Sequence, residues 1–330
     1  MKRKIAFAIV IALIFGGAAM PAAAQTETVD ISDFKVAFEE FSDALAGTLN
    51  LNSTIGNTWS DGWIGGFPHF GAGLALGSTF AGKDASQALI TAIGQNLPSE
   101  LENLGVPIPA VAATAKIGLP FLPVDVGLKA GIIPQSVGDK LEGLYGVKTE
   151  YKNVGISLRG ALVKEKLILP EISLGVSGNY LTGKVSAPVG SDQELTIPTS
   201  GNPVIFNQPM LDLEWTTKTL DFTAQVSKKI LLILTPYIGA GYTIGTSDVS
   251  GGLTATVDDS ALVASDYTWL SDNGIVLSDQ GFLYSTTSKD PTFRIYGGLS
   301  LNILVALDLQ MMYVPATKNL GGSLTARIQL

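Results

Sequence analysis

The sequence contains no cysteine and a single histidine, His69. Disulfides and thiolate metal sites therefore cannot hold the fold, and a histidine-rich metal centre is excluded. Charged residues are also scarce, at 15% of the chain, although the mean hydropathy is positive at +0.33. Beyond the first 24 residues, no uninterrupted apolar run approaches the roughly 18 residues that a membrane-spanning helix needs. An apolar chain without such helices is typical of a membrane β-barrel, in which alternate strand residues face lipid.

The first 24 residues have the pattern of a secretory signal peptide. Basic residues at 2–4 precede the apolar run Ile5–Phe15, and small residues lead up to Ala24, after which we expect cleavage. The alternative, an uncleaved anchor helix, is disfavoured because the run is short and lacks basic residues on its far side. No cysteine follows the expected cleavage point, so lipid attachment there is excluded.

Basic side chains are in deficit beyond residue 24, where 18 lysines and arginines face 29 acidic residues, a net charge of −11. Proteins bind nucleic acid through clustered lysines and arginines that displace counterions. We therefore exclude nucleic acid as a partner, and we expect no cofactor.

Strict alternation of apolar with small or polar residues recurs along the chain. In one example, Ile172, Leu174 and Val176 alternate with Ser173 and Gly175. The pattern predicts an all-β protein, a transmembrane antiparallel β-barrel of about ten strands (range 8–12) with an N-terminal helix. The expected strands are 69–80, 110–119, 122–133, 146–163, 167–186, 208–227, 230–246, 291–302, 305–315 and 319–330. The apolar parity changes within 208–227, which a β-bulge at Thr216–Thr219 would explain. The count is open because 291–315 could be one long strand.

The expected connections alternate in length. Those after the second, fourth, sixth and eighth strands are very short, whereas most of the others are long: 81–109, 134–145, 187–207 and 247–290. Outer-membrane barrels combine tight periplasmic turns with longer outside loops. We therefore expect a protein of the cell outer membrane with both termini in the periplasm and outer-membrane lipid around it.

Helical spacing precedes the first strand. Phe34, Phe38, Phe41 and Leu45 recur at three- and four-residue steps, which predicts a helix over 33–46. It either sits at the periplasmic mouth or folds into the barrel as a plug. The expected organisation is a signal peptide (1–24), a periplasmic helix or plug segment (25–66) and the barrel (67–330). A second helix is expected near 84–97, in the first outside connection.

Several stretches resemble the uncharacterised outer-membrane barrel proteins of spirochaetes. They are Trp59-Ser-Asp-Gly-Trp63, Gly66-Phe-Pro-His-Phe-Gly71, Leu122-Pro-Val-Asp-Val-Gly-Leu-Lys129, Gln225-Val-Ser-Lys228 and Thr235-Pro-Tyr-Ile-Gly-Ala-Gly241. The C-terminus is similar to the signal read by the barrel-assembly machinery, although that signal usually ends in an aromatic residue and this chain ends in Leu330. The resemblance implies a barrel fold, an outer-membrane location and assembly by that machinery; it implies no reaction.

Nine charged residues fall on the interior-facing parity of the expected strands. They are Lys116, Asp125, Lys129, Arg159, Glu171, Asp221, Arg294, Asp308 and Arg327. One interpretation is an ion-pair network that fills a narrow barrel, and the other is a constriction with weak selectivity for anions. Glu39, Glu40 and Asp43 of the helix could serve as partners, which favours a plugged lumen.

Other candidate sites are weaker. His69 is expected to be a hydrogen-bonded lumen or interface residue, and without a second histidine we expect no catalytic site. The seven aspartates of 247–290 lack calcium-loop spacing, which favours a solvated acidic loop. Candidate members of interfacial aromatic belts are Trp59, Trp63, Phe67, Tyr180, Tyr237, Tyr267 and Trp269.

These observations favour a non-enzymatic barrel, either a narrow or plugged channel for small solutes or a ligand-binding barrel. The alternative is a surface interaction protein that acts through its long outside connections. An outer-membrane hydrolase is the least favoured reading. The solute or ligand cannot be read from the residues.

Overall fold

The computed structural model describes residues 31–92, 97, 99, 101–134, 136, 138–140, 148–166, 168–188, 193–230, 233–258, 260–273 and 282–330. The expected signal peptide, 1–24, lies outside the described residues.

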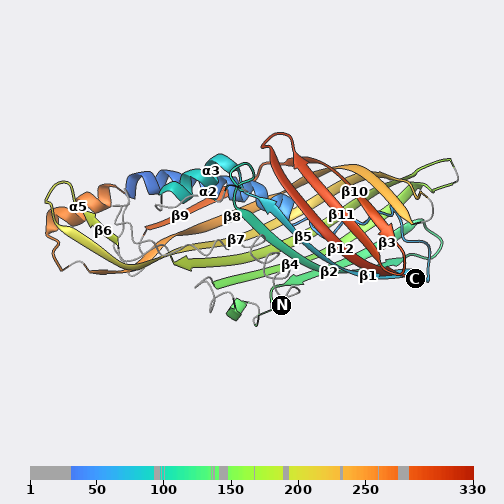
Figure 1. Ribbon diagram of the computed structural model, residues 1–330, viewed down its shortest axis with the longest axis horizontal. Helices are drawn as coiled ribbons and strands as arrows, with labels where there is room; N and C mark the ends of the chain where they lie inside the picture. The colour runs from blue at the N-terminus through green and yellow to red at the C-terminus, as the bar shows by residue number, and fades with distance from the viewer. Residues whose placement is uncertain are drawn as a thin grey trace.

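Ten strands form a closed antiparallel barrel, as the alternation predicts (Figure 1). Strands β1 and β12 pair with each other and close the sheet, and β7 pairs with β8. Two shorter strands, β6 (Gln193–Thr196) and β9 (Phe282–Ser288), pair along β7 and β8 beyond the barrel wall. The barrel strands are β1 (Phe70–Phe80), β2 (Pro107–Gly118), β3 (Val124–Ile132), β4 (Lys148–Val163), β5 (Glu171–Pro188), β7 (Pro203–Ser227), β8 (Leu234–Asp258), β10 (Thr292–Asn302), β11 (Ala306–Val314) and β12 (Asn319–Gln329).

The wall of the barrel is apolar outside and polar inside. On β10, Phe293, Ile295 and Leu299 are exposed, whereas Arg294 and Ser300 are completely buried. A soluble barrel would bury the first set and expose the second. The observed distribution is that of strands whose outer face meets lipid.

The two ends of the barrel differ. The end that holds the connections β2–β3, β4–β5, β7–β8 and β10–β11 is called the short-turn end, and the opposite end the long-connection end. Leu330 lies at the short-turn end, where its backbone pairs with that of Phe70. The sequence predicts these four short turns correctly, and the β11–β12 turn (315–318) is also brief, at the other end.

Strands β7 and β8 have 25 residues each, whereas β10 and β12 have 11. The start of β7 and the end of β8, which pair with each other, therefore project past the rest of the wall at the long-connection end, together with β6, β9 and helix α5 (Ala264–Asp272) (Figure 1). The prediction of one acidic loop over 247–290 is wrong, because 247–258 continue β8 and 282–288 form β9. In this projecting part, backbone hydrogen bonds hold β7 and β8 together, although its residues lack the apolar alternation of the wall.

The β-bulge expected at Thr216–Thr219 is absent. Pairing with β5 and with β8 is continuous from Met210 to Ser227, and the register shift lies at Asn207/Met210. From Leu211 to Ser227, the odd-numbered residues of β7 face the interior, and the interior changes from apolar to polar along them. Leu213 and Trp215 are buried in an apolar cluster near the long-connection end, and Asp221 is buried in a polar zone below it.

Helix α2 (Ile31–Asn52) lies at the long-connection end, packed against β8, β9 and helix α3 (Lys83–Ala92) (Figure 1). Its Phe38 ring meets the ring of Tyr284 on β9 edge to face, and Asp43 accepts a hydrogen bond from Thr286. A helix at the short-turn mouth, one of the two expected positions, is therefore wrong for this structure. The expected helix 84–97 ends at Ala92; of its remainder the structure describes Leu97, which is buried outside the helix.

An apolar cluster holds α2 in place. Phe34, Phe38, Phe41 and Leu45 are all buried in it, together with Trp215 and other side chains from the inner face of the wall. The spacing that predicts the helix thus also identifies the face that packs. Glu40 and Asp43 lie on its exposed face, so they do not reach the lumen charges.

Candidate functional site: a lumen filled by residues 53–66

After α2, residues 53–66, named here the lumen segment, run through the barrel from the long-connection end to the short-turn end. The Ser53 hydroxyl lies 2.9 Å from that of Thr219 on β7, and Gln225, six residues closer to the short-turn end, donates to the carbonyls of Trp59 (3.0 Å) and Ser60 (2.8 Å). Gln329, next to the C-terminus, donates to the carbonyl of Ile64 at 3.3 Å. The segment therefore traverses the lumen.

A first group of wall charges holds the lower part of the lumen segment. Arg159 pairs with Asp125 at 3.0 Å and also donates to the carbonyl of Asp61. The same oxygen of Asp125, Oδ2, also accepts the backbone N–H of Ile64 at 3.2 Å. Glu171 accepts the N–H of Gly62 at 3.0 Å. These contacts satisfy backbone groups that would otherwise be buried without partners.

Arg327 is the centre of a second group. Its guanidinium reaches Asp308 on the wall at 2.7 Å and Asp61 of the lumen segment at 2.8 Å. It also donates to the Ser60 hydroxyl at 2.7 Å. Its charge is therefore shared between the wall and the segment.

Trp59 lies in this group close to two cations. The Lys116 ammonium is 4.7 Å from the ring centroid, and the Arg327 guanidinium is 5.1 Å from it. Lys116 also donates to the carbonyl of Asn57 at 2.8 Å. The indole thus packs against two cations that the barrel wall supplies.

A third group lies closer to α2. Lys129 donates to the carbonyls of Ser53 and Ile55. Arg294 and Asp221 form a doubly hydrogen-bonded pair at 2.6 and 2.9 Å and meet Thr243, not the lumen segment. The structure therefore buries all nine predicted charges; six bond the segment directly, Asp308 reaches it through Arg327, and Asp221 and Arg294 pair with each other.

Residues 53–66 fall within the expected helix or plug segment (25–66), but none of them was predicted to bind the wall charges. Asp61 supplies the carboxylate that was expected from Glu39, Glu40 or Asp43. Gly56 has a backbone φ of 86°, and a Cβ on it would lie 2.9 Å from the Cβ of Ala112, so this close approach requires glycine. The one feature of the sequence that could have identified this segment is the polar and aromatic stretch Trp59 to Trp63, which precedes the first strand.

Only some of the residues expected in the interfacial aromatic belts lie on the outer surface. Trp59 and Tyr237 are buried inside the barrel, because their side chains lie on the lumen segment and on an inward-facing position of β8. Tyr180 and Phe67 are exposed on the outside. Trp63 lies under the ammonium of Lys164, 4.4 Å from its ring centroid, at the short-turn end.

His69 and the aspartates do not form a built site among the described residues. His69 is exposed at the short-turn end, where its ring nitrogen bonds the Gly66 carbonyl. Within the described ranges no three histidine, aspartate or glutamate side chains come close enough to share a metal ion. None of the helices in the described part of the chain has the length and apolar character needed to cross a membrane.

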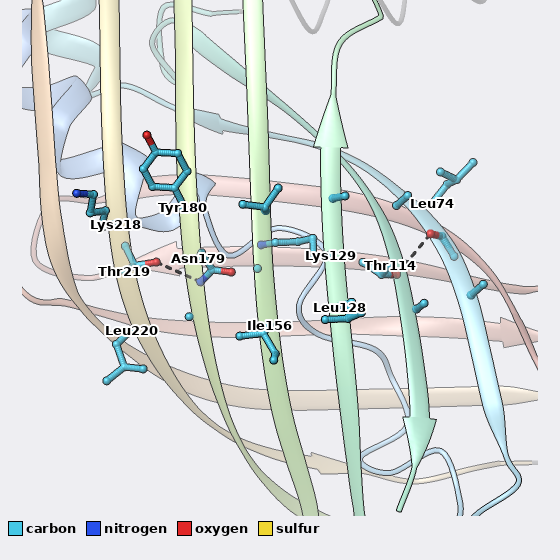
Figure 2. A pocket seen from close by; sticks show the side chains of 18 of the residues that line it. Leu74, Thr114, Leu128, Lys129, Ile156, Asn179, Tyr180, Lys218, Thr219 and Leu220 are labelled. Carbon is cyan, nitrogen blue, oxygen red and sulfur yellow. Dashed lines mark hydrogen bonds between the residues drawn. The ribbon is translucent and has the colours of Figure 1, made fainter.

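A hollow of about 1710 Å³ lies along the wall, lined by residues of β1 to β5, β7, β8 and β12 (Figure 2). The inward-facing Thr114, Lys129, Asn179 and Thr219 contribute to its lining. Outward-facing Leu74, Leu128, Ile156 and Leu220 line it as well, and no described residue of the lumen segment does. Since exposed wall residues form much of its lining, the hollow is not a chamber inside the lumen, and it holds no candidate site.

The chain matches no family model and no curated protein. Similar solved structures include the translocator domain of autotransporter NalP from Neisseria meningitidis, with 9% identity, a TM-score of 0.34 and coverage of 93% of this chain and 99% of that one. The transport unit of the autotransporter AIDA-I from Escherichia coli has 11% identity, a TM-score of 0.33 and coverage of 86% and 98%. The Ralstonia pickettii toluene transporter TbuX has 9% identity, a TM-score of 0.27 and coverage of 84% and 90%. At this level of similarity the matches carry no argument about what this chain transports or binds.

Proposed function

We propose that this protein is an outer-membrane β-barrel whose lumen is closed by its own N-terminal segment, and that small solutes pass when that segment moves aside. The observation that carries the proposal is the course of residues 53–66 through the lumen, with the wall charges bonded to it. A ten-stranded barrel is wide enough to hold such a segment and too narrow to leave a wide channel beside it.

The membrane location is supported by the wall itself. Large apolar residues cover its outside on every barrel strand from β1 to β12, and polar residues fill its inside. The short connections support a periplasmic short-turn end. With that orientation Leu330 is periplasmic and α2 lies at the outer side.

Planar-bilayer recording of the refolded protein tests this function. The full-length protein is expected to be silent or to open rarely, and a variant that lacks 31–66 is expected to show discrete open steps. A second variant, Trp59→Ala with Asp61→Ala, keeps the chain length and removes the buried indole and the carboxylate that contact Lys116 and Arg327. It is expected to open more often than the full-length protein. Slower migration after boiling on a detergent gel verifies that each variant is folded. Silence of both folded variants, or equal conductance in all three proteins, would contradict the proposal.

One observation favours a second function, adhesion or another surface interaction. The paired start of β7 and end of β8 project past the wall with β6, β9 and α5. Helix α5 is anchored there because Asp266 accepts a hydrogen bond from Asn202 at 2.8 Å. Loss of cell or matrix binding on shortening 247–290, with the barrel intact, would favour this function over solute passage.

A further inference from the structure

The turns at the short-turn end carry large apolar side chains. Phe121 in the β2–β3 turn, Ile168 in the β4–β5 turn and Leu304 in the β10–β11 turn are 86 to 103% exposed. Ile230 and Ile233 in the β7–β8 turn are exposed as well. Apolar turn residues thus occur all around this end, although turns in water favour Gly, Pro, Asn, Asp and Ser.

The outer apolar faces of the strands are too short to match a bilayer without these turns. They extend from Ile238 to Ile244 on β8 and from Phe293 to Leu301 on β10. With ~3.3 Å per residue and a tilt of ~40°, these faces cover roughly 15 and 20 Å of membrane thickness, whereas the apolar band of an outer-membrane barrel is about 25 Å tall. Extension to Ile233 and to Leu304 raises both heights to roughly 28 Å. The turns therefore complete the apolar band.

Basic residues cluster at the same end. The β4–β5 turn contains Lys164 and Lys166, and the β7–β8 turn contains Lys228 and Lys229, against the single acidic residue Glu165. The two turns touch, since Lys228 pairs with Glu165 at 3.2 Å and donates to the carbonyl of Leu169 at 3.1 Å. Lysines beside an apolar band extend their ammonium groups toward headgroup phosphates.

We infer that the short-turn end is immersed in a bilayer leaflet, with its apolar turns in the lipid and with Lys166 and Lys229 on the phosphates of anionic phospholipids. A lipid surface fits better than a protein partner because the apolar turns surround the barrel and continue the apolar outer faces of the strands. A protein partner would need one patch on one side. The inference rests on the membrane location in the proposed function.

Introduced cysteines test it, because the chain has none of its own. Phe121→Cys, Leu304→Cys and, on the mid-wall outer face, Leu309→Cys are labelled with bimane and reconstituted in phospholipid vesicles; slower migration after boiling verifies folding. Brominated phospholipids are expected to quench all three labels, and aqueous iodide is expected to quench none of them strongly. Quenching of the 121 and 304 labels by iodide and not by bromolipid, with 309 quenched by bromolipid, would overturn the inference and leave the membrane barrel intact. Failure of bromolipid to quench 309 as well would overturn both.

A second measurement tests the lysines. With bimane on Ile168→Cys, brominated phosphatidylglycerol is expected to quench more strongly than brominated phosphatidylcholine. Adding Lys166→Gln and Lys229→Gln is expected to lower that preference about twofold or more, since each basic residue near the surface attracts anionic lipid. Equal quenching by the two lipids before the lysines are changed would overturn the assignment of phosphates to this end.

Discussion

At the scale of single residues, buried ion pairs hold the interior side chains of this barrel in fixed positions. Arg294 and Asp221 are almost completely buried and share two hydrogen bonds. A buried charge is tolerated only while its partner and its hydrogen bonds are present. These residues therefore couple β10 to β7 over the inner face of β8, which pairs with both strands.

Removing one member of this pair is expected to cost more than removing both. Arg294→Met leaves Asp221 buried without its cation and should lower the free energy of unfolding by roughly 3–5 kcal/mol, whereas Arg294→Met with Asp221→Leu should recover most of that loss. Urea unfolding in detergent micelles measures both. For comparison, Glu165→Gln breaks the half-exposed pair with Lys228 and should cost at most about 1 kcal/mol. Equal losses in the single and double variants would contradict the assignment.

At the scale of elements, strands and the helix could be predicted because their faces differ in polarity. In β10 and β12, apolar residues alternate with polar ones because one face meets lipid and the other the lumen. In α2, the spacing of the phenylalanines identifies the face that packs. Neither pattern reports distance along the barrel axis. The extent of β7 and β8 beyond the wall was therefore missed, because residues there have no lipid on their outer face.

The contacts of the lumen segment could not be predicted for a related reason. Its contacts are made largely by backbone carbonyls and N–H groups, which every residue has, so no side-chain pattern identifies 53–66 as the partner of the wall charges. The nine charges themselves were identifiable from parity, since a charge on the inner face of a strand needs a partner. The sequence did not reveal that Asp61 is that partner for Arg327.

Helix α2 provides a test of the apolar cluster. Phe38 is fully buried, and Phe38→Ala removes a ring from contact with Phe34 and Tyr284. We expect a loss of roughly 3–5 kcal/mol in the packing of the helix. Proteolysis within α2 should speed up while the barrel keeps its slower migration after boiling. Val36→Ala, at an exposed position of the same helix, should leave the rate unchanged. Equal proteolysis rates for the two variants would show that α2 is not held by this cluster.

The outer face of the wall has its own test. Leu309 is exposed on β11, and Leu309→Arg should destabilise the barrel by roughly 2–4 kcal/mol if that position lies near the middle of the membrane. Ser250→Arg, on the outer face of the projecting part of β8, should have little effect. The midpoints of unfolding in lipid vesicles compare the two. A residue of the inner face does not serve as the control. Ser177, for example, is buried and accepts a hydrogen bond from Asn57 at 2.8 Å.

At the scale of the whole molecule, the opposite placement of α2 and Leu330 makes the orientation testable. Val36 is exposed on α2 at the long-connection end, and Lys166 is exposed in a short turn. On intact cells, a membrane-impermeant maleimide should label Val36→Cys and should label Lys166→Cys only after the outer membrane is opened. The reverse pattern would invert the proposed orientation.

The central claim is that residues 53–66 occupy the lumen in the membrane, and cross-linking tests it most directly. The hydroxyls of Ser53 and Thr219 lie 2.9 Å apart inside the barrel, whereas the neighbouring Leu220 faces outward. Ser53→Cys with Thr219→Cys should form a disulfide in native membranes, seen as a change of gel mobility that a reductant reverses. Ser53→Cys with Leu220→Cys should form none. Absence of the first cross-link, or equal formation of both, would contradict a filled lumen.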